Sequence, residues 1–118
     1  MKLLVAGSRS IKDFELERYI PYGVSLIITG GAEGIDTIAE QYADKKRISK
    51  LVLRPQYDLY GRAAPLKRNE KMVELCDMAL IIWDGISKGS NYTINYAKKL
   101  GKQVILITKN KQVAISSR

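Results

Sequence analysis

Five short apolar runs, at residues 3–6, 26–28, 51–53, 79–83 and 104–107, limit the folds open to this chain. Each run is continuous rather than alternating, which is typical of strands buried on both faces of a parallel sheet. Segments with apolar residues at helical spacing separate the runs and predict four intervening helices. With right-handed crossovers, we expect an α/β Rossmann-like three-layer sandwich: a parallel five-stranded sheet of order 3-2-1-4-5 with helices on both faces.

The length predicts a single domain, because 118 residues suffice for one core and not for two. We assign residues 1–108 to this Rossmann-like domain and 109–118 to a polar C-terminal tail, with room for one short extra strand at 113–115. The longest irregular piece is 56–64, before Pro65, which suits the first position of a helix. No apolar run is long enough to cross a bilayer and the N-terminus lacks a signal-peptide core, so a cytoplasmic location and no membrane partner are expected.

The chain contains no histidine and a single cysteine, Cys76. This excludes Ser-His-Asp and Cys-His nucleophilic sites, the usual transition-metal sites and an internal disulfide. Neither a metal nor a cofactor is expected. The net charge of +8 reflects either solvated helix ends or a field that attracts anions. We favour small anions over polymers, because aromatic and basic residues are not interleaved along one strand or helix.

Residues 29–36, TGGAEGID, join the second apolar run to an amphipathic helical segment. A glycine-rich turn between a strand and a helix N-terminus favours an anion, since free N–H groups and the helix dipole face it. The alternative is a turn that only needs positive φ.

In a sheet of this order, ligands bind beyond the carboxyl ends of the strands where the strand order reverses. The loops at 7–10, 29–36 and 84–90 meet there, and each is rich in glycine and polar or charged residues. Their convergence predicts a ligand that carries phosphate. The loop after the first run lacks G-x-G-x-x-G, which argues against a conventional dinucleotide-dependent dehydrogenase, and residues 87–90 lack P-loop spacing.

Four motifs in order resemble the YspA-like branch of the SLOG superfamily: GSR at 7–9, TGGAEGID at 29–36, YGRAAP at 60–65 with Arg68 and Asn69, and WDG at 83–85 with 87–90 and Thr93. This branch is related to the LOG phosphoribohydrolases and to the Rossmann-like core of the DprA proteins. The resemblance implies a protein that binds, senses or sequesters a nucleotide-derived small molecule such as an ADP-ribose or cyclic-nucleotide relative. It also implies a homodimer or higher oligomer and a role in phage-defence signalling, in the host cytoplasm if the chain is virus-encoded.

The fourth-strand loop departs from the P-G-G-x-G-T-x-x-E of the LOG enzymes, so the resemblance favours a non-catalytic protein. One alternative is an N-glycosidic phosphoribohydrolase acting on nucleoside monophosphates, with Glu33 as the catalytic carboxylate and Glu40 as the weaker candidate. A second alternative, suggested by the charge, is DprA-like binding of nucleic acid.

We expect Arg9 to clamp a phosphate, and Tyr57 or Tyr60 either to stack on a base or to pack the long loop. The predicted ligand-binding residues are Gly7, Ser8, Arg9, Thr29, Gly30, Gly31, Glu33, Gly34, Asp36, Arg62, Arg68, Asn69, Trp83, Asp84, Gly85, Ser87, Lys88, Gly89, Ser90 and Thr93.

Overall fold

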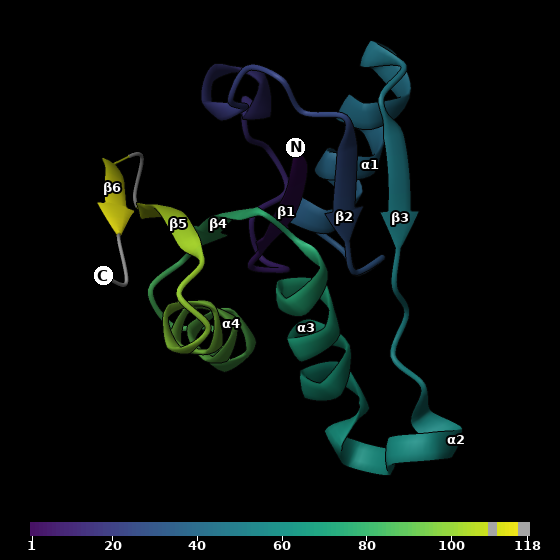
Figure 1. The fold of residues 1–118 in the computed structure, drawn as a ribbon. Coiled ribbons are helices and arrows are strands. Elements are labelled where there is room, and N and C mark those ends of the chain that lie inside the picture. The colour runs from purple at the N-terminus through teal and green to yellow at the C-terminus, as the bar shows by residue number, and fades with distance from the viewer. Residues whose placement is uncertain (109–110, 116–118) are drawn as a thin grey trace.

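The computed structural model describes residues 1–108 and the backbone of 111–115, which form one twisted sheet with helices on both sides (Figure 1). The parallel strands are β1 (Lys2–Gly7), β2 (Leu26–Thr29), β3 (Ser49–Val52), β4 (Met78–Trp83) and β5 (Gln103–Thr108). Their order, β3-β2-β1-β4-β5, confirms the predicted Rossmann-like arrangement.

A sixth strand, β6 (Lys111–Ile115), pairs antiparallel with β5 at the edge of the sheet. Its register places Val113 opposite Leu106. Residues 109–110 and 116–118 of the expected tail lie outside the described residues.

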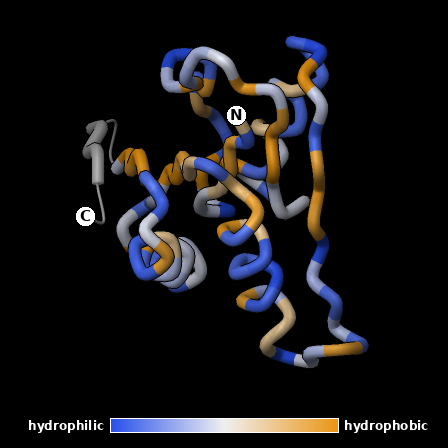
Figure 2. Tube along the Cα trace, in the orientation of Figure 1, coloured by the Kyte–Doolittle hydropathy of each residue, from blue (hydrophilic) through white to orange (hydrophobic). Residues whose placement is uncertain are grey.

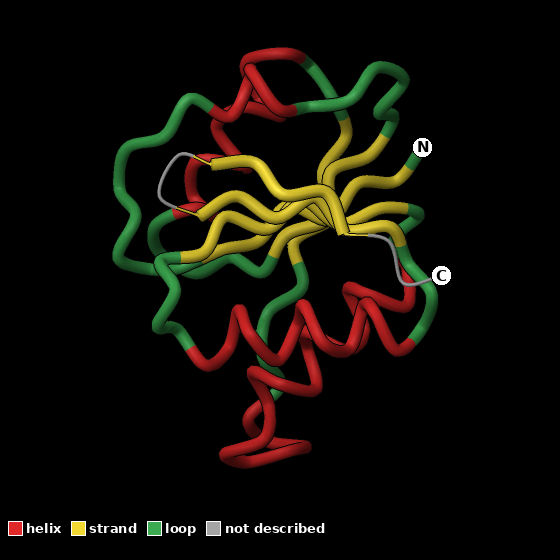
Figure 3. The backbone as a smooth tube through the Cα atoms, turned by 90° about the vertical axis from the view of Figure 1, so that its left-hand side faces the viewer, coloured by secondary structure: helices red, strands yellow, loops and turns green. Residues whose placement is uncertain are grey.

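The two faces of the sheet are covered by different helices. α1 (Ile35–Lys46) and the short 3₁₀ turn η1 (Leu16–Tyr19) pack on one face, and α3 (Ala64–Leu75) and α4 (Lys88–Lys99) on the other. Figure 3 shows helices on both sides of the strands. None of the helices in the described part of the chain is long and apolar enough to span a membrane.

Successive side chains of β1 enter two separate cores. Leu3 and Val5 belong to the core under α1 with Ile35, whereas Leu4 belongs to the core under α3 and α4 with Met72. All of these side chains are buried. Because both faces of the central strands need apolar residues, their sequences are continuous apolar runs (Figure 2).

The first of the four predicted helices, between the runs at 3–6 and 26–28, does not form as a regular helix, because only the four-residue turn η1 is found there. Leu16 is the single buried residue of this turn, and no side chain caps its start. Phe14 and Tyr19 instead stack on each other, with ring centroids 5.4 Å apart. A helix this short, with one buried residue, buries too little apolar surface to offset the unfavourable free energy of helix nucleation.

The segment expected to be irregular contains two short turns, α2 (Tyr57–Tyr60) and η2 (Gly61–Ala63). Figures 1 and 3 both show α2 projecting from the body of the molecule. α3 then begins at Ala64, with Pro65 in its first turn as the sequence indicated.

Candidate ligand site at the carboxyl ends of the strands

A cavity of about 400 Å³ lies at the carboxyl ends of β1 and β4, beside α3. Ten predicted residues line it: Gly7, Arg9, Asp36, Arg68, Asn69, Asp84, Ser87, Gly89, Ser90 and Thr93. The structure therefore brings the three predicted loops together around one hollow. The sequence-based list omitted the lining residues Ala6, Ser10, Ala32, Pro65, Leu66 and Met72. A residue one position beyond a motif, such as Ser10, gave no signal apart from its place in the loop.

The loops after β1 and β4 are joined by hydrogen bonds between Asp84 and two serines. The Ser8 hydroxyl accepts from the Asp84 amide at 2.9 Å, and the Ser10 hydroxyl donates to the Asp84 carboxylate at 2.8 Å. Ser8 is buried and does not line the cavity. It therefore holds the loops in place rather than facing a ligand.

The Asp84 carboxylate also organises its own loop. It accepts from the amides of Ser87 at 2.8 Å and Ile86 at 2.9 Å. These two amides, followed by the Ser10 hydroxyl, lower the pKa of Asp84 to about 2. Asp84 is thus a fixed negative charge on the cavity wall at neutral pH.

Asp36 is a second carboxylate at the cavity, and it is only 5% exposed. It accepts a hydrogen bond from the Ala32 amide at 3.1 Å, and its Oδ1 has no partner among the described residues. Burial raises the pKa of Asp36, while the Ala32 amide and the charge of Arg68 lower it by less. The buried Thr29 hydroxyl also lacks a partner and does not line the cavity.

Arg68 connects the ends of two strands to α3. Its guanidinium donates to the carbonyl of Gly30 and, at 3.2 Å, to that of Leu53; its Nε donates to the Asn69 side chain at 2.8 Å. Burial lowers the pKa of Arg68, partly offset by the charge of Asp36. Arg9, in contrast, is exposed, and no ion pair or hydrogen bond occupies its guanidinium in the described structure.

The glycines of residues 29–36 serve packing inside the protein. A Cβ on Gly30 would lie 2.7 Å from Arg68 Nη1, and one on Gly34 would lie 2.6 Å from the Ser8 carbonyl oxygen. Neither glycine lines the cavity, and the Ala32 amide is already bound to Asp36. A carboxylate of the chain itself therefore occupies this predicted anion site.

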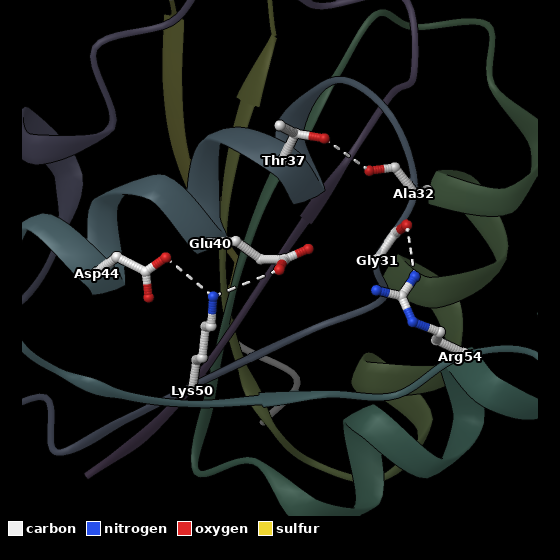
Figure 4. Close-up of polar contacts among 7 residues, drawn as sticks. All are labelled: Gly31, Ala32, Thr37, Glu40, Asp44, Lys50 and Arg54. Atoms are coloured by element: carbon white, nitrogen blue, oxygen red, sulfur yellow. Dashed lines mark hydrogen bonds and ion pairs between the residues drawn. The ribbon is translucent and has the colours of Figure 1, made fainter.

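Contacts from outside hold the same turn (Figure 4). Arg54 donates to the Gly31 carbonyl at 3.3 Å, and the Thr37 hydroxyl donates to the Ala32 carbonyl at 3.0 Å. Gly31, at φ +72°, does not line the cavity.

The N-terminus of α4 supplies the second predicted anion site. Ser87 caps this 12-residue helix by accepting from the Ser90 amide at 3.5 Å, and Gly89 in the first turn lines the cavity. The Trp83 indole donates to the Ser87 carbonyl at 2.9 Å, which anchors the turn. The positive end of α4 therefore borders the cavity. Lys88, in the same turn, is exposed and does not line it.

Three further predicted residues lie apart from the cavity. The Glu33 side chain is 79% exposed and pairs with Lys12 at 3.2 Å. Arg62 is exposed in η2, and Gly85 is exposed at φ +85°. The weaker carboxylate candidate, Glu40, also lies elsewhere, pairing with Lys50 at 3.6 Å (Figure 4). No group of three or more metal-ligating side chains occurs within the described residues.

Comparison with known proteins gives one informative relationship. The chain is 32% identical to the Gene 61 protein of Mycobacterium phage D29 over 119 aligned residues, covering 88% of this chain and 94% of the phage protein. The chain belongs to the Gene 61 protein family. No family model and no solved structure matches it. The related region therefore takes in most of this chain and nearly all of the Gene 61 protein.

Proposed function

We propose that the protein binds a small nucleotide-derived molecule, such as an ADP-ribose or cyclic-nucleotide relative, and senses or sequesters it without turnover. The proposal depends on one observation. The Arg9 guanidinium, which makes no ion pair or hydrogen bond in the described structure, and the N-terminus of α4 border the same cavity of about 400 Å³. Two positive groups from separate segments favour a phosphate between them.

The negatively charged Asp84 suits the ribose part of such a ligand. Its carboxylate stays ionised at neutral pH and lines the same cavity as Arg9. A carboxylate can accept hydrogen bonds from the hydroxyls of a ribose, which a bare phosphate lacks. The cavity volume falls within the range of small-molecule sites.

The loop motifs also resemble those of the YspA-like SLOG proteins, whose expected ligands are nucleotide derivatives. Kinship with a phage protein is consistent with a role in phage-defence signalling, in which a phage protein captures a host nucleotide signal in the host cytoplasm. Assembly into a homodimer or higher oligomer stays part of this proposal, and light scattering coupled to size-exclusion chromatography tests it.

Titration calorimetry against ADP-ribose derivatives and cyclic nucleotides tests the binding. We expect saturable binding of at least one compound and loss of that binding in Arg9→Ala. The matched control is Arg18→Ala, because Arg18 is exposed on η1 and pairs only weakly with Glu15, at 3.8 Å. Silence across the panel, or equal affinity of Arg9→Ala and wild type, contradicts the proposal.

A separate incubation with nucleoside monophosphates tests the hydrolase alternative. Chromatography of nucleoside monophosphates after incubation shows whether free base is released, and Glu33→Gln shows whether Glu33 is required. Glu33 is exposed, pairs with Lys12 and does not line the cavity, which gives no support to that role. We therefore expect no release of base.

A further inference from the structure

The segment from Arg54 to Lys71 carries a net positive charge and includes the part of the chain that projects from the sheet. It contains five cationic and two acidic residues. Figures 1 and 3 show its helix α2 farther from the sheet than the rest of this segment. A concentrated charge on a projecting surface favours an anionic partner large enough to cross it.

Two adjoining hollows flank α2. One, of about 530 Å³, is lined by Tyr60, Lys67 and Lys71; the other, of about 440 Å³, is lined by Tyr57. Gln56 borders both, so the hollows are neighbours. Each hollow therefore offers one aromatic side chain, three residues apart in the sequence.

Both tyrosine rings are accessible. Tyr57 is 58% exposed and Tyr60 is 44% exposed, and no residue of α2 is buried. Exposed aromatic rings beside cations are the platforms on which unpaired bases stack. A protein partner would instead favour a patch with few lysines.

Two carboxylates at the larger hollow accept hydrogen bonds from tyrosines of α4. Glu70 accepts a hydrogen bond from the Tyr92 hydroxyl, and Glu74 accepts one from the Tyr96 hydroxyl at 2.8 Å. Lys67 also pairs with Glu70, at 3.6 Å. Lys71 is exposed and makes no ion pair within the described residues.

We propose that residues 54–71 bind single-stranded nucleic acid, with Tyr57 and Tyr60 each stacking on a base while Arg62, Lys71 and their neighbours contact phosphates. Sequence reasoning favoured small anions because no single strand or helix interleaves aromatic and basic residues. Folding brings the two kinds together around the larger hollow, where Tyr60 of α2 lies with Arg54 and with Lys67 and Lys71 of α3. The surface adjoins the Arg9 cavity, because Arg68 lines both the larger hollow and that cavity. Tyr57, Tyr60 and Lys71 do not line the cavity, so their proposed role does not depend on the small-molecule ligand.

Fluorescence anisotropy with a labelled oligothymidylate of about 12 nucleotides tests the proposal. We expect binding at about 50 mM salt that weakens steeply at about 200 mM, and weaker binding of a duplex of the same length. Tyr57→Ala and Tyr60→Ala should each lower the affinity about tenfold, whereas Tyr60→Phe should retain it. Tyr22→Ala is the matched control, because Tyr22 is fully exposed away from α2.

A pair of charge reversals locates the phosphate contacts. Arg62→Glu with Lys71→Glu should abolish binding, and Lys98→Glu with Lys99→Glu, which changes the net charge equally at the far end of α4, should reduce it only slightly. Circular dichroism confirms that each variant is folded. The proposal is overturned by absence of binding at low salt, by equal losses in both charge pairs, by unaltered affinity in the tyrosine variants, or by loss of binding in Arg9→Ala.

Discussion

The Ser10 hydroxyl donates to the Asp84 carboxylate at 2.8 Å across 74 residues of sequence, joining the loops that follow β1 and β4. These strands are neighbours in the sheet, so the bond spans the point where strand order reverses. The cavity wall is therefore built by hydrogen bonds between loops, and the carboxylate that joins the loops is also one of the charged groups that line the cavity.

Asp84→Asn is expected to destabilise the protein at neutral pH and to have little effect in strong acid. The folded-state pKa of about 2 lies below the ordinary 3.8, so the ionised form is the one that the fold stabilises. That contribution is complete above about pH 4 and disappears as the pH falls through 2. Thermal melting of both proteins across this range measures it. A difference in melting temperature that is independent of pH contradicts the assignment.

Asp36→Asn is expected to show the opposite dependence on pH. Burial raises the pKa of Asp36, so the fold favours its neutral form. The resulting stability is present below the ordinary pKa and is lost as the pH rises through the raised value. The stability of Asp36→Asn relative to wild type should therefore increase from pH 4 toward neutral pH, as measured by urea unfolding. A difference in unfolding free energy between Asp36→Asn and wild type that does not change with pH argues against a raised pKa.

Sequence reasoning reached the sheet order because continuous apolar runs at 3–6 and 79–83 can only be central, doubly covered strands. It also placed the cavity, since the ends of parallel strands share one edge. It assigned a phosphate to Arg9 and gave Arg68 no specific role, because Arg68 follows a long loop whose path the sequence does not define. Their roles differ through the carbonyl groups of Gly30 and Leu53, which only the folded backbone brings within reach of Arg68.

The sequence also did not show what the glycine-rich turn at residues 29–36 binds. Its composition suits an external anion, yet the side chain of Asp36 folds back onto the Ala32 amide. Whether a turn binds a ligand or a carboxylate of its own chain depends on one side-chain conformation, which sequence spacing does not specify. The 3₁₀ turn at Leu16–Tyr19 was missed for a related reason: how much of a short periodic segment is buried depends on its neighbours.

Arg9→Ala and Arg68→Ala are expected to separate binding from stability. Arg68→Ala leaves the Gly30 and Leu53 carbonyls without their donor and should cost about 2 kcal/mol of unfolding free energy. Arg9→Ala should change stability by less than about 0.5 kcal/mol, because Arg9 is exposed. Urea unfolding measures both. Equal destabilisation by the two substitutions shows that Arg9 has a structural partner.

Cys76 is expected to resist thiol reagents in the folded protein. It is buried, and burial raises the pKa of its thiol to about 11, so almost no thiolate is present at about pH 8. Labelling with a chromogenic disulfide should be slow for the native protein and complete within minutes in concentrated guanidinium. Rapid labelling of the native protein at a rate independent of urea would mean that Cys76 is accessible.

Gly34→Ala is expected to be more damaging than Gly101→Ala, although both glycines have φ +75°. An alanine at either position bears the cost of positive φ, about 1–2 kcal/mol. At Gly101 the added Cβ meets open space, whereas at Gly34 it would lie 2.6 Å and 2.7 Å from the carbonyl oxygens of Ser8 and Arg9. The difference between the two variants in urea unfolding therefore reports the close approach of the α1 start to the β1 loop together with the ψ of −125° at Gly34, which lies outside the left-handed region. It should reach about 1–3 kcal/mol. The added Cβ would displace the carbonyl groups of Ser8 and Arg9. Gly34→Ala should therefore also lower the affinity for a ligand that Arg9 binds, while Gly101→Ala should leave that affinity unchanged. Equal stability of the two variants would show that the loop after β1 moves aside without a cost in free energy. Such a mobile loop would not fix the position of Arg9 at the cavity.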